Sequence, residues 1–245
     1  MKKVVLVDGN NLLFRSYYAT AYSGNFMKNS KGFPTNALYG FVNMINKIIN
    51  DEKPEYMLVA FDKGKTFRHD KYEDYKAGRI EMPNELKQQF PVAKEILTNL
   101  GIKWFEIENY EADDIVGTLA KMIDESDDYK GLIVSSDKDL LQLITDKVVM
   151  KMLKTKDYVM MTKETFFETY GLTPEKMIDI KALQGDSSDN IPGVKGIGEK
   201  TALKLLQDYG SLEGVYDNIA YIKGAAATKL INGREKAFGT SSIGM

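Results

Sequence analysis

Residues 3–10 read KVVLVDGN, an apolar run that ends in an aspartate. The pattern returns in YMLVAFD and GLIVSSD, and amphipathic segments of helical length lie between these runs. Short apolar strands that alternate with helices predict a parallel α/β sheet. Ligands gather beyond the carboxyl ends of such strands, so the aspartates that end these three runs should reach one crevice. They are Asp8, Asp62 and Asp137.

Nine carboxylates recur in five short phrases, each placed where a predicted strand ends or a helix begins. A stable fold gathers so much negative charge only around something positive. Hard divalent cations such as Mg²⁺ and Mn²⁺ prefer oxygen ligands and keep several waters, so they suit a dispersed carboxylate set. The pattern favours a metal-dependent phosphoryl-transfer enzyme. The nine residues are Asp8, Asp62, Glu111, Asp113, Asp114, Asp137, Asp139, Asp186 and Asp189.

The phrase YEADD differs from the others because its carboxylates fall in the first turn of a predicted helix. Glu111 and Asp114 share a face by their i, i+3 spacing, and acidic side chains are favoured at a helix N-terminus. Simple capping therefore explains this phrase as it stands. A catalytic role gains support from the other phrases that point to the same crevice.

Composition excludes several chemistries. The chain of 245 residues has no cysteine, which rules out thiolate nucleophiles, zinc fingers, iron–sulfur clusters and a disulfide-built domain. Its single histidine, His69, leaves no pair for a zinc site, and we interpret it as a surface residue. The apolar run Val4–Val7 is too short for a signal peptide, and no stretch is long enough to span a membrane. We expect a soluble, cytoplasmic chain.

Outside the carboxylate phrases, basic residues outnumber acidic ones, which suggests a basic surface. The net charge is −2, but nine of the 35 acidic residues belong to the carboxylate phrases, which leaves 26 against 33 basic residues and a balance of +7. Part of this surplus lies between Lys63 and Arg79. A solvated helix face of mixed charge explains that stretch equally well.

The chain changes character after Lys151. Residues 151–172 predict a β-hairpin around Lys156 and Asp157 followed by a helix, and helices with glycine turns dominate from there on. We place a domain boundary near Tyr170.

The stretch IPGVKGIGEKTALKLLQDYGSL carries the second motif. Its glycines predict a tight turn between two helices, where small residues let a phosphate approach free backbone N–H groups. This is the helix-hairpin-helix arrangement, which grips one DNA strand by its phosphates without reading bases. The residues expected to bind DNA here are Gly193, Lys195, Gly196, Gly198, Lys200 and Thr201.

With both motifs in place, the sequence closely resembles the 5′ nuclease (5′-3′ exonuclease) domain of bacterial DNA polymerase I, part of the flap endonuclease family. The match covers nearly all of residues 3–238, with several separate phrases in the right order. The resemblance implies a PIN-like, parallel-sheet nuclease core with a helical arch and a helical helix-hairpin-helix (H3TH) C-terminal domain. The phrases are VVLVDGNNLLFRSYYA, FDKGKTFRH, YKAGR, YEADD, SSDKDLLQL and ALQGDSSDNIPGVKGIGEKTALKLL.

The resemblance also implies two Mg²⁺ ions, for which Mn²⁺ can substitute, and hydrolysis of a phosphodiester near the 5′ end of a strand. Paired metals stabilise both the attacking and the leaving oxygen, which agrees with this chemistry. Around the first ion it places Asp8, Asp62, Glu111, Asp113 and Asp114. Around the second it places Asp137, Asp139, Asp186 and Asp189.

Catalytic groups beside the metals are implied as well. The phrase YKAGR would lie on a helix at the base of the arch, where Lys76 and Arg79 contact the scissile phosphate and Tyr75 offers a stacking face. Arg68 and Lys71 are basic residues on the same approach and are expected to bind DNA. The chain from Arg79 to Glu95 would complete the arch. For Phe14, Tyr17 and Tyr18, core packing and stacking on a base pair both remain open.

Three regions are expected: residues 1–170 as the metal-dependent core with its arch, residues 171–238 as the DNA-binding domain, and residues 239–245 as a flexible tail. The family domain usually continues with a charged helical stretch where this chain has GTSSIGM. No polymerase region is present, so we expect either a stand-alone nuclease or a part of a polymerase.

Two functions remain in view. The first is a structure-specific 5′ nuclease for DNA with a 5′ flap, nick or 5′ end, active in replication and repair, with no membrane partner and no small-molecule ligand besides the metal. A polymerase, fused or separate, is a candidate partner. The alternative is a catalytically idle DNA-junction binding module, against which the full set of nine carboxylates weighs. An RNA-cutting enzyme is disfavoured by the helix-hairpin-helix motif.

Overall fold

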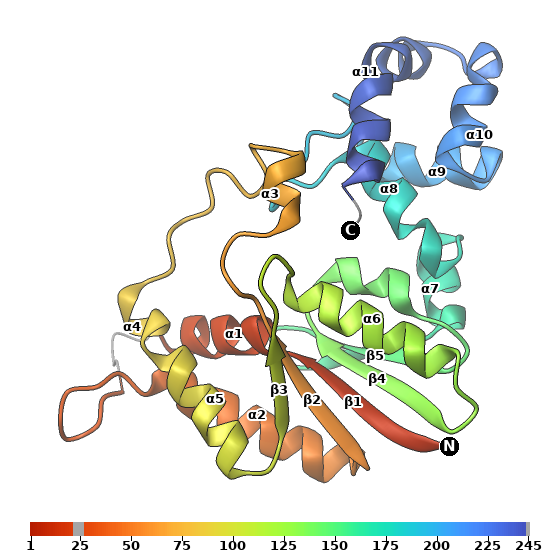
Figure 1. Ribbon diagram of the computed structural model, residues 1–245. Coiled ribbons are helices and arrows are strands. Elements are labelled where there is room, and N and C mark those ends of the chain that lie inside the picture. The colour runs from red at the N-terminus through yellow and green to blue at the C-terminus, as the bar shows by residue number, and fades with distance from the viewer. Residues whose placement is uncertain (22–26, 244–245) are drawn as a thin grey trace. The chain divides into compact units, whose positions relative to one another are not determined.

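The structure is a computed structural model that describes residues 1–21 and 27–243 (Figure 1). The chain forms two compact units. The first comprises residues 1–66, 80–140 and 145–160, and the second comprises residues 67–79, 141–144 and the chain from Met161 onward. No helix in the described part of the chain is both long and apolar enough to cross a membrane.

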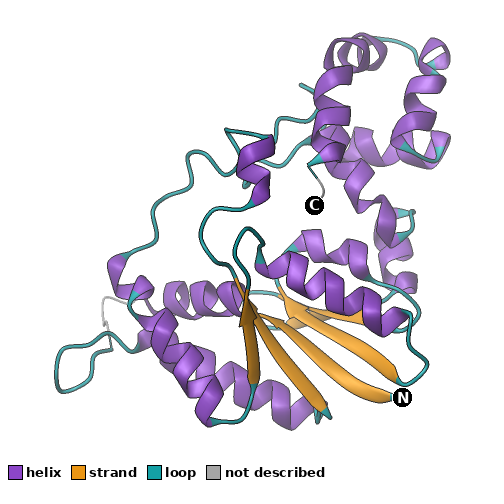
Figure 2. Ribbon diagram, in the orientation of Figure 1, coloured by secondary structure: helices purple, strands orange, loops and turns teal. Residues whose placement is uncertain are grey.

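A six-stranded sheet lies at the centre of the first unit (Figure 2), in the order β3-β2-β1-β4-β5-β6. The pairs β3–β2, β2–β1, β1–β4 and β4–β5 are parallel, which confirms the predicted α/β sheet. Val5, Leu6 and Val7 of β1 are fully buried, as expected for a parallel strand covered on both faces. The strands are β1 (Lys2–Asp8), β2 (Tyr56–Phe61), β3 (Lys103–Glu106), β4 (Tyr129–Ser135), β5 (Val148–Leu153) and β6 (Tyr158–Met161).

Helices cover both faces of this sheet (Figure 2). Side chains of α1, α2 and α5 share one apolar core with β1 and β2, whereas α6 packs on the other face against β1, β2 and β4. The helices of this unit are α1 (Gly9–Ala21), α2 (Asn36–Glu52), α4 (Asn84–Lys87), α5 (Gln89–Asn99) and α6 (Ala112–Asp124). A 3₁₀ segment, Lys138–Leu143, follows β4.

Helix α2 shows why the apolar pattern forms this core. Ala37, Phe41, Ile45 and Ile48 recur at helical spacing and are all buried. The helix ends at Lys53, which adopts a left-handed conformation with φ of 46°. This geometry turns the chain toward β2.

The predicted hairpin and the helix after it are confirmed. Strands β5 and β6 are joined by a turn in which the Lys154 N–H donates to the carbonyl of Asp157 at 2.8 Å. Helix α7 then begins at a Thr162 cap and ends at Gly171, whose φ of 66° suits glycine. The helices of the second unit are α3 (Phe67–Lys71), α7 (Lys163–Tyr170), α8 (Met177–Gln184), α9 (Glu199–Tyr209), α10 (Leu212–Asp217) and α11 (Ala225–Ser242), with 3₁₀ turns at Pro174–Lys176 and Ile219–Tyr221.

Two local expectations are wrong. The phrase YKAGR is not helical, because α3 ends at Lys71 and the chain continues through successive turns with positive φ at Lys76 and Gly78. Residues 239–243 also do not form the expected flexible tail, since α11 continues to Ser242 and both Thr240 and Ile243 are buried. Residues 244–245 lie outside the described residues.

A buried ion-pair cluster ties three elements of the first unit together. Glu52, at the end of α2, accepts from Lys151 Nζ of β5 at 2.7 Å and from Lys3 Nζ of β1 at 3.3 Å. The Lys151 side chain is only 5% exposed. Burial acts to raise the pKa of Glu52, but the two lysine contacts outweigh it and lower that pKa. Glu52 is therefore ionised and compensates a buried ammonium.

Replacing Glu52 with Gln should lower the free energy of unfolding by about 3 kcal/mol, because it leaves the buried Lys151 charge without its partner. Guanidinium unfolding measures this. Asp51→Asn is the matched control, since Asp51 forms an exposed pair with Lys47. The cluster has no structural role if both variants unfold at the same denaturant concentration.

Candidate metal and DNA site

The carboxyl end of β1 delivers Asp8 into a polar environment. Asp8 is buried, and its two oxygens accept from the Asn11 backbone N–H at 2.9 Å and from Ser135 Oγ at 3.0 Å. Ser135 is the last residue of β4, which pairs with β1. The strand ends therefore meet as the sequence predicts.

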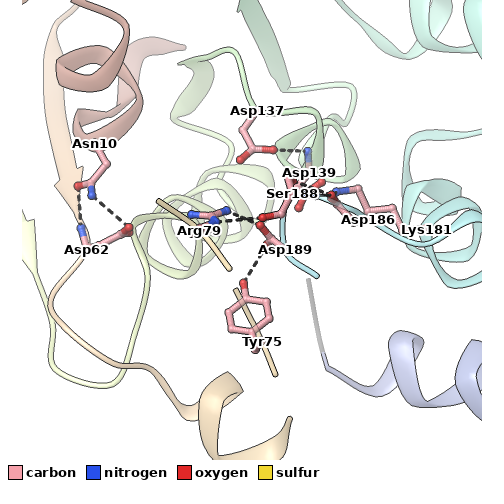
Figure 3. Close-up of polar contacts among 10 residues, drawn as sticks. All are labelled: Asn10, Asp62, Tyr75, Arg79, Asp137, Asp139, Lys181, Asp186, Ser188 and Asp189. Atoms are coloured by element: carbon pink, nitrogen blue, oxygen red, sulfur yellow. Dashed lines mark hydrogen bonds and ion pairs between the residues drawn. The ribbon is translucent and has the colours of Figure 1, made fainter. Parts of the chain in front are cut away.

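Asp62 follows β2 directly and ties that strand to the start of α6. Its Oδ1 accepts from the Ala112 N–H at 2.7 Å. Asn10 bonds it twice, donating from Nδ2 to Oδ2 at 3.1 Å and accepting the Asp62 N–H at 3.0 Å (Figure 3). These contacts hold the Asp62 carboxylate at the carboxyl end of β2, beside the first residue of α6.

The YEADD phrase combines capping with charge. Glu111 is the N-cap of α6, and its backbone N–H donates to Asp114 Oδ2 at 2.8 Å in a capping box. The capping interpretation is thus confirmed for these two residues. Asp113 takes no part in that box, so its position on the first turn calls for another explanation.

Electrostatics show that five carboxylates share one neighbourhood. Burial, and after it the charges of Asp62 and Asp137, raise the pKa of Asp8 to about 7, against the two hydrogen bonds that Asp8 accepts. Burial, followed by the charges of Asp8, Asp137, Asp62 and Glu111, raises the pKa of Asp113 well above its ordinary value. Such a set is fully ionised at neutral pH only when a cation offsets the repulsion.

Asp137 and Asp139 extend this neighbourhood beyond β4. The Asp137 N–H donates to Ser135 Oγ at 3.1 Å, and the Asp139 N–H donates to Asp137 Oδ1 at 2.9 Å. Within residues 1–21 and 27–243, no three histidine, aspartate or glutamate side chains form a ready-made chelate. Mg²⁺ is held by few direct carboxylates and keeps several waters, so spaced carboxylates suit a hydrated ion.

In the second unit, Asp189 is enclosed by the phrase YKAGR. Tyr75 donates its hydroxyl to Asp189 Oδ2 at 3.1 Å, and the Arg79 guanidinium forms an ion pair with Oδ1 (Figure 3). The Lys76 N–H donates to the Asp189 carbonyl at 2.9 Å. The positive φ values of Lys76 and Asn190, both 57°, accompany this close packing of the two loops.

Asp186 is held ionised by its own partners. Lys181 donates to Oδ2, and Ser188 donates to Oδ1 from its N–H at 2.8 Å and its hydroxyl at 2.6 Å. Burial acts to raise the pKa of Asp186, but these contacts outweigh it and lower the pKa to about 2. Both acidic residues of this phrase therefore have cationic side chains as neighbours.

Two expectations about side-chain exposure differ from the structure, and one open question is answered. Tyr75 is 3% exposed, so its ring offers no stacking face, because its hydroxyl is turned inward to Asp189. Arg68 is 4% exposed and lies over the ring of Phe67, which removes it from the DNA-accessible surface. Tyr17 belongs to the apolar core of the first unit. Lys71 is exposed, as expected.

The helix-hairpin-helix turn presents its polar residues to solvent. Val194 and Ile197 are buried and anchor the turn, and Gly198 is the N-cap of α9. Close packing also requires a glycine at position 193, since a Cβ there would lie 2.1 Å from the backbone nitrogen of Gly185. The exposed members of the motif are Lys195, Gly196, Gly198, Lys200 and Thr201.

Sequence reasoning missed several supporting residues. Asn10 and Asn11 follow the first strand directly, and this polar pair after a buried strand was a signal that could have identified them. Asn11 accepts the Ser136 N–H at 3.0 Å and so joins the ends of β1 and β4. Lys229 of α11 donates to the Gly196 carbonyl at 3.0 Å, and its distant position in the chain gave no signal of that contact.

Comparison with known sequences identifies relatives over the whole chain. Residues 3–171 match the family described as 5′-3′ exonuclease, N-terminal resolvase-like domain, and residues 172–243 match 5′-3′ exonuclease, C-terminal SAM fold. DNA polymerase I of Streptococcus pneumoniae is 46% identical over 97% of this chain, which spans 27% of that protein. A 5′-3′ exonuclease of Bacillus subtilis is 45% identical over 94% of this chain and 78% of its own length.

Solved structures agree with this fold. A phage T5 flap endonuclease in a pseudo-enzyme-product complex with DNA and metal ions has a TM-score of 0.77 at 26% identity, covering 98% of this chain and 88% of the other. A T5 5′-exonuclease with bound divalent zinc ions has a TM-score of 0.78 at 27% identity, with the same coverage. Because both family domains match in order and a 45% identical relative is covered over most of its length, the chain belongs to the 5′-3′ exonuclease family.

Proposed function

We propose that this chain is a structure-specific 5′ nuclease that hydrolyses phosphodiester bonds at 5′ ends and 5′ flaps of DNA with two Mg²⁺ ions. The observation that carries the proposal is the group of carboxylates at the strand ends of the first unit, where burial first, and neighbouring carboxylates after it, raise the pKa of both Asp8 and Asp113. Family membership and the T5 complex with DNA and metal ions support it.

The donor set suits hard divalent cations, since all of its members are carboxylates. When bound, paired ions polarise the phosphate, stabilise the attacking and leaving oxygens and lower the pKa of a bound water. We assign one ion to Asp8, Asp62, Glu111, Asp113 and Asp114. We assign the other to Asp137, Asp139, Asp186 and Asp189.

Lys76 and Arg79 are proposed to contact the scissile phosphate. The Arg79 guanidinium forms its ion pair with Asp189 here and also donates to the Ser188 carbonyl at 3.1 Å. Arginine binds phosphate as well as carboxylate through the same donor fork, so an incoming phosphate can compete for it. Tyr75 then orients Asp189 through its hydroxyl and does not stack on a base.

The hairpin before α9 is proposed to hold duplex DNA by its phosphates. The first backbone N–H groups of α9 have no partner within the helix and point toward the exposed turn. Lys195 and Lys200 add positive charge, and Lys229 supports the turn from α11. Such contacts position DNA without reading its bases.

A role in replication and repair, with a polymerase as partner, extends the proposal. It rests on the relatives that are DNA polymerase I, of which this chain spans about a quarter.

Labelled 5′-flap DNA tests the central activity. Cleavage with Mg²⁺ or Mn²⁺, and its loss in EDTA, is the expected result. Flap binding without cleavage in either metal would identify an idle junction-binding module. Cleavage that persists in EDTA would contradict the metal assignment.

Asp113→Asn should have opposite effects on stability and activity. Burial and neighbouring carboxylates raise the pKa of Asp113, so its ionised form destabilises the folded chain as pH rises from the ordinary carboxyl range toward its folded pKa. In EDTA at pH 8 the variant should therefore unfold at higher denaturant concentration than the parent. Cleavage in Mg²⁺ should fall on the order of a hundredfold or more.

Asp217→Asn is the matched control, because it removes the same charge at an exposed position. It should change neither the stability in EDTA nor the cleavage rate in Mg²⁺. If Asp113→Asn destabilises the metal-free chain, the repulsion account is wrong.

Lys76→Ala should lower the single-turnover rate by about a hundredfold and change DNA affinity much less, because a contact to the reacting phosphate strengthens as charge builds. Rates at saturating enzyme on flap DNA measure this. Lys47→Ala, which removes an exposed lysine of α2 outside the expected arch, serves as the control. An unaltered rate would remove Lys76 from the catalytic residues.

Lys200→Ala should weaken duplex binding similarly on all sequences and reduce the slope of log affinity against log salt by about one unit. Titration of labelled duplexes at several salt concentrations measures both. Lys121→Ala, an exposed lysine on α6, should leave the slope unchanged. A loss confined to particular base sequences would argue against a phosphate contact.

A further inference from the structure

A cavity of about 590 Å³ lies within the second unit, lined in part by the end of α3 and the last turns of α11. Its volume is in the range of small-molecule and nucleotide sites. None of the residues proposed above for the metal ions or for the hairpin lines it. Its lining consists of Lys71, Tyr72, Pro192, Lys236, Gly239, Thr240, Ser242 and Ile243.

The described residues that line this cavity carry positive charge only. Two lysines line it, and among its described lining residues none is acidic. Lys71 Nζ lies 3.5 Å from the Ser242 carbonyl and 5.2 Å from the centre of the Phe67 ring, so its stem is held against the wall. An ammonium has three donors, and a single long contact to a carbonyl leaves it donors for an anion.

Thr240 supplies the observation that points to a ligand. It is 3% exposed, and its hydroxyl finds no hydrogen-bond partner within the described residues. A helical threonine commonly donates to the carbonyl one turn earlier, and a buried hydroxyl without a partner is unfavourable. The hydroxyl oxygen itself is buried behind the wall of the cationic cavity, so a rotation of the Thr240 side chain brings it to a bound acceptor.

The remaining wall suits the rest of a nucleotide. Tyr72 is half-buried and follows α3, and Pro192 and Ile243 add apolar surface. An aromatic ring gives a stacking face for any base. The lining therefore combines donors for a phosphate with apolar surface for a base or sugar.

We propose that this cavity binds a phosphorylated nucleotide end, with the phosphate held by Lys71, Lys236 and the Thr240 hydroxyl and the base or sugar against Tyr72. A terminal 5′-phosphate is the favoured source, because a dianion gains more from two ammonium groups than a backbone diester does. This choice of source rests on the proposed function at 5′ ends of DNA. The phosphate site itself does not depend on it.

Two-dimensional NMR of the full chain in EDTA tests the site without cleavage. Thymidine 5′-monophosphate should shift the amide signals of Gly239 and Thr240, whereas thymidine should not. Lys236→Gln and Thr240→Val should each weaken this binding about tenfold, the loss expected for one charge-assisted or buried hydrogen bond. Lys121→Gln, which removes an exposed lysine of α6, should change nothing.

The inference is overturned if the monophosphate causes no shift up to about 10 mM. It is also overturned if both variants keep the parent affinity. If Thr240→Val does not fold, the test rests on Lys236→Gln, which should fold because Lys236 is exposed.

Short oligonucleotides separate the two sources of phosphate. A 5′-phosphorylated hexathymidylate should bind the cavity more tightly than the same strand without its terminal phosphate. Equal binding of both strands, still weakened by Lys236→Gln, would keep the phosphate site and assign it to the diester backbone. If the protein binds the phosphorylated strand in this way but does not cut flap DNA, the phosphate site stands and the proposed nuclease function is wrong.

Discussion

Repulsion among carboxylates at the strand ends is the constraint on which the rest of the first unit depends. Parallel strands bring Asp8, Asp62 and Asp137 to one edge of the sheet, and the first turn of α6 adds Glu111 and Asp113. Each strand-end carboxylate accepts a hydrogen bond from a backbone N–H or a polar side chain. Those contacts orient the oxygens, but they do not neutralise them, which leaves a need for cations.

The second unit treats its acidic residues in another way. Asp186 is paired with Lys181, and Asp189 is paired with Arg79, so each carboxylate has an internal counter-charge. Arg79 can exchange a carboxylate for a phosphate because its donor fork fits both. Asp189 also fixes the shape of the YKAGR loop, because its carbonyl accepts the Lys76 N–H and its carboxylate accepts the Tyr75 hydroxyl. The proposed substrate contact, Arg79, and the proposed metal ligand, Asp189, therefore belong to one local structure.

Periodicity and strand-end residues were enough to predict the parallel sheet, the hairpin after β5 and the gathering of Asp8, Asp62 and Asp137. They were not enough for features set by contacts distant in the chain. Tyr75 turns inward because Asp189, over a hundred residues later, accepts a hydrogen bond from its hydroxyl. The helical expectation for YKAGR failed for the same reason, since the Asp189 carbonyl takes the Lys76 N–H. Close packing on Gly185 also requires a glycine at position 193, and the sequence pattern did not indicate that contact.

Anomalous diffraction from crystals grown with Mn²⁺ tests the central claim most directly, because it locates the cation independently of any activity. One strong peak should lie beside Asp8, Asp62, Glu111, Asp113 and Asp114 and a second beside Asp137 and Asp139, with waters completing the coordination of each ion. The absence of Mn²⁺ from these carboxylates, in crystals that bind it elsewhere or not at all, would contradict the account.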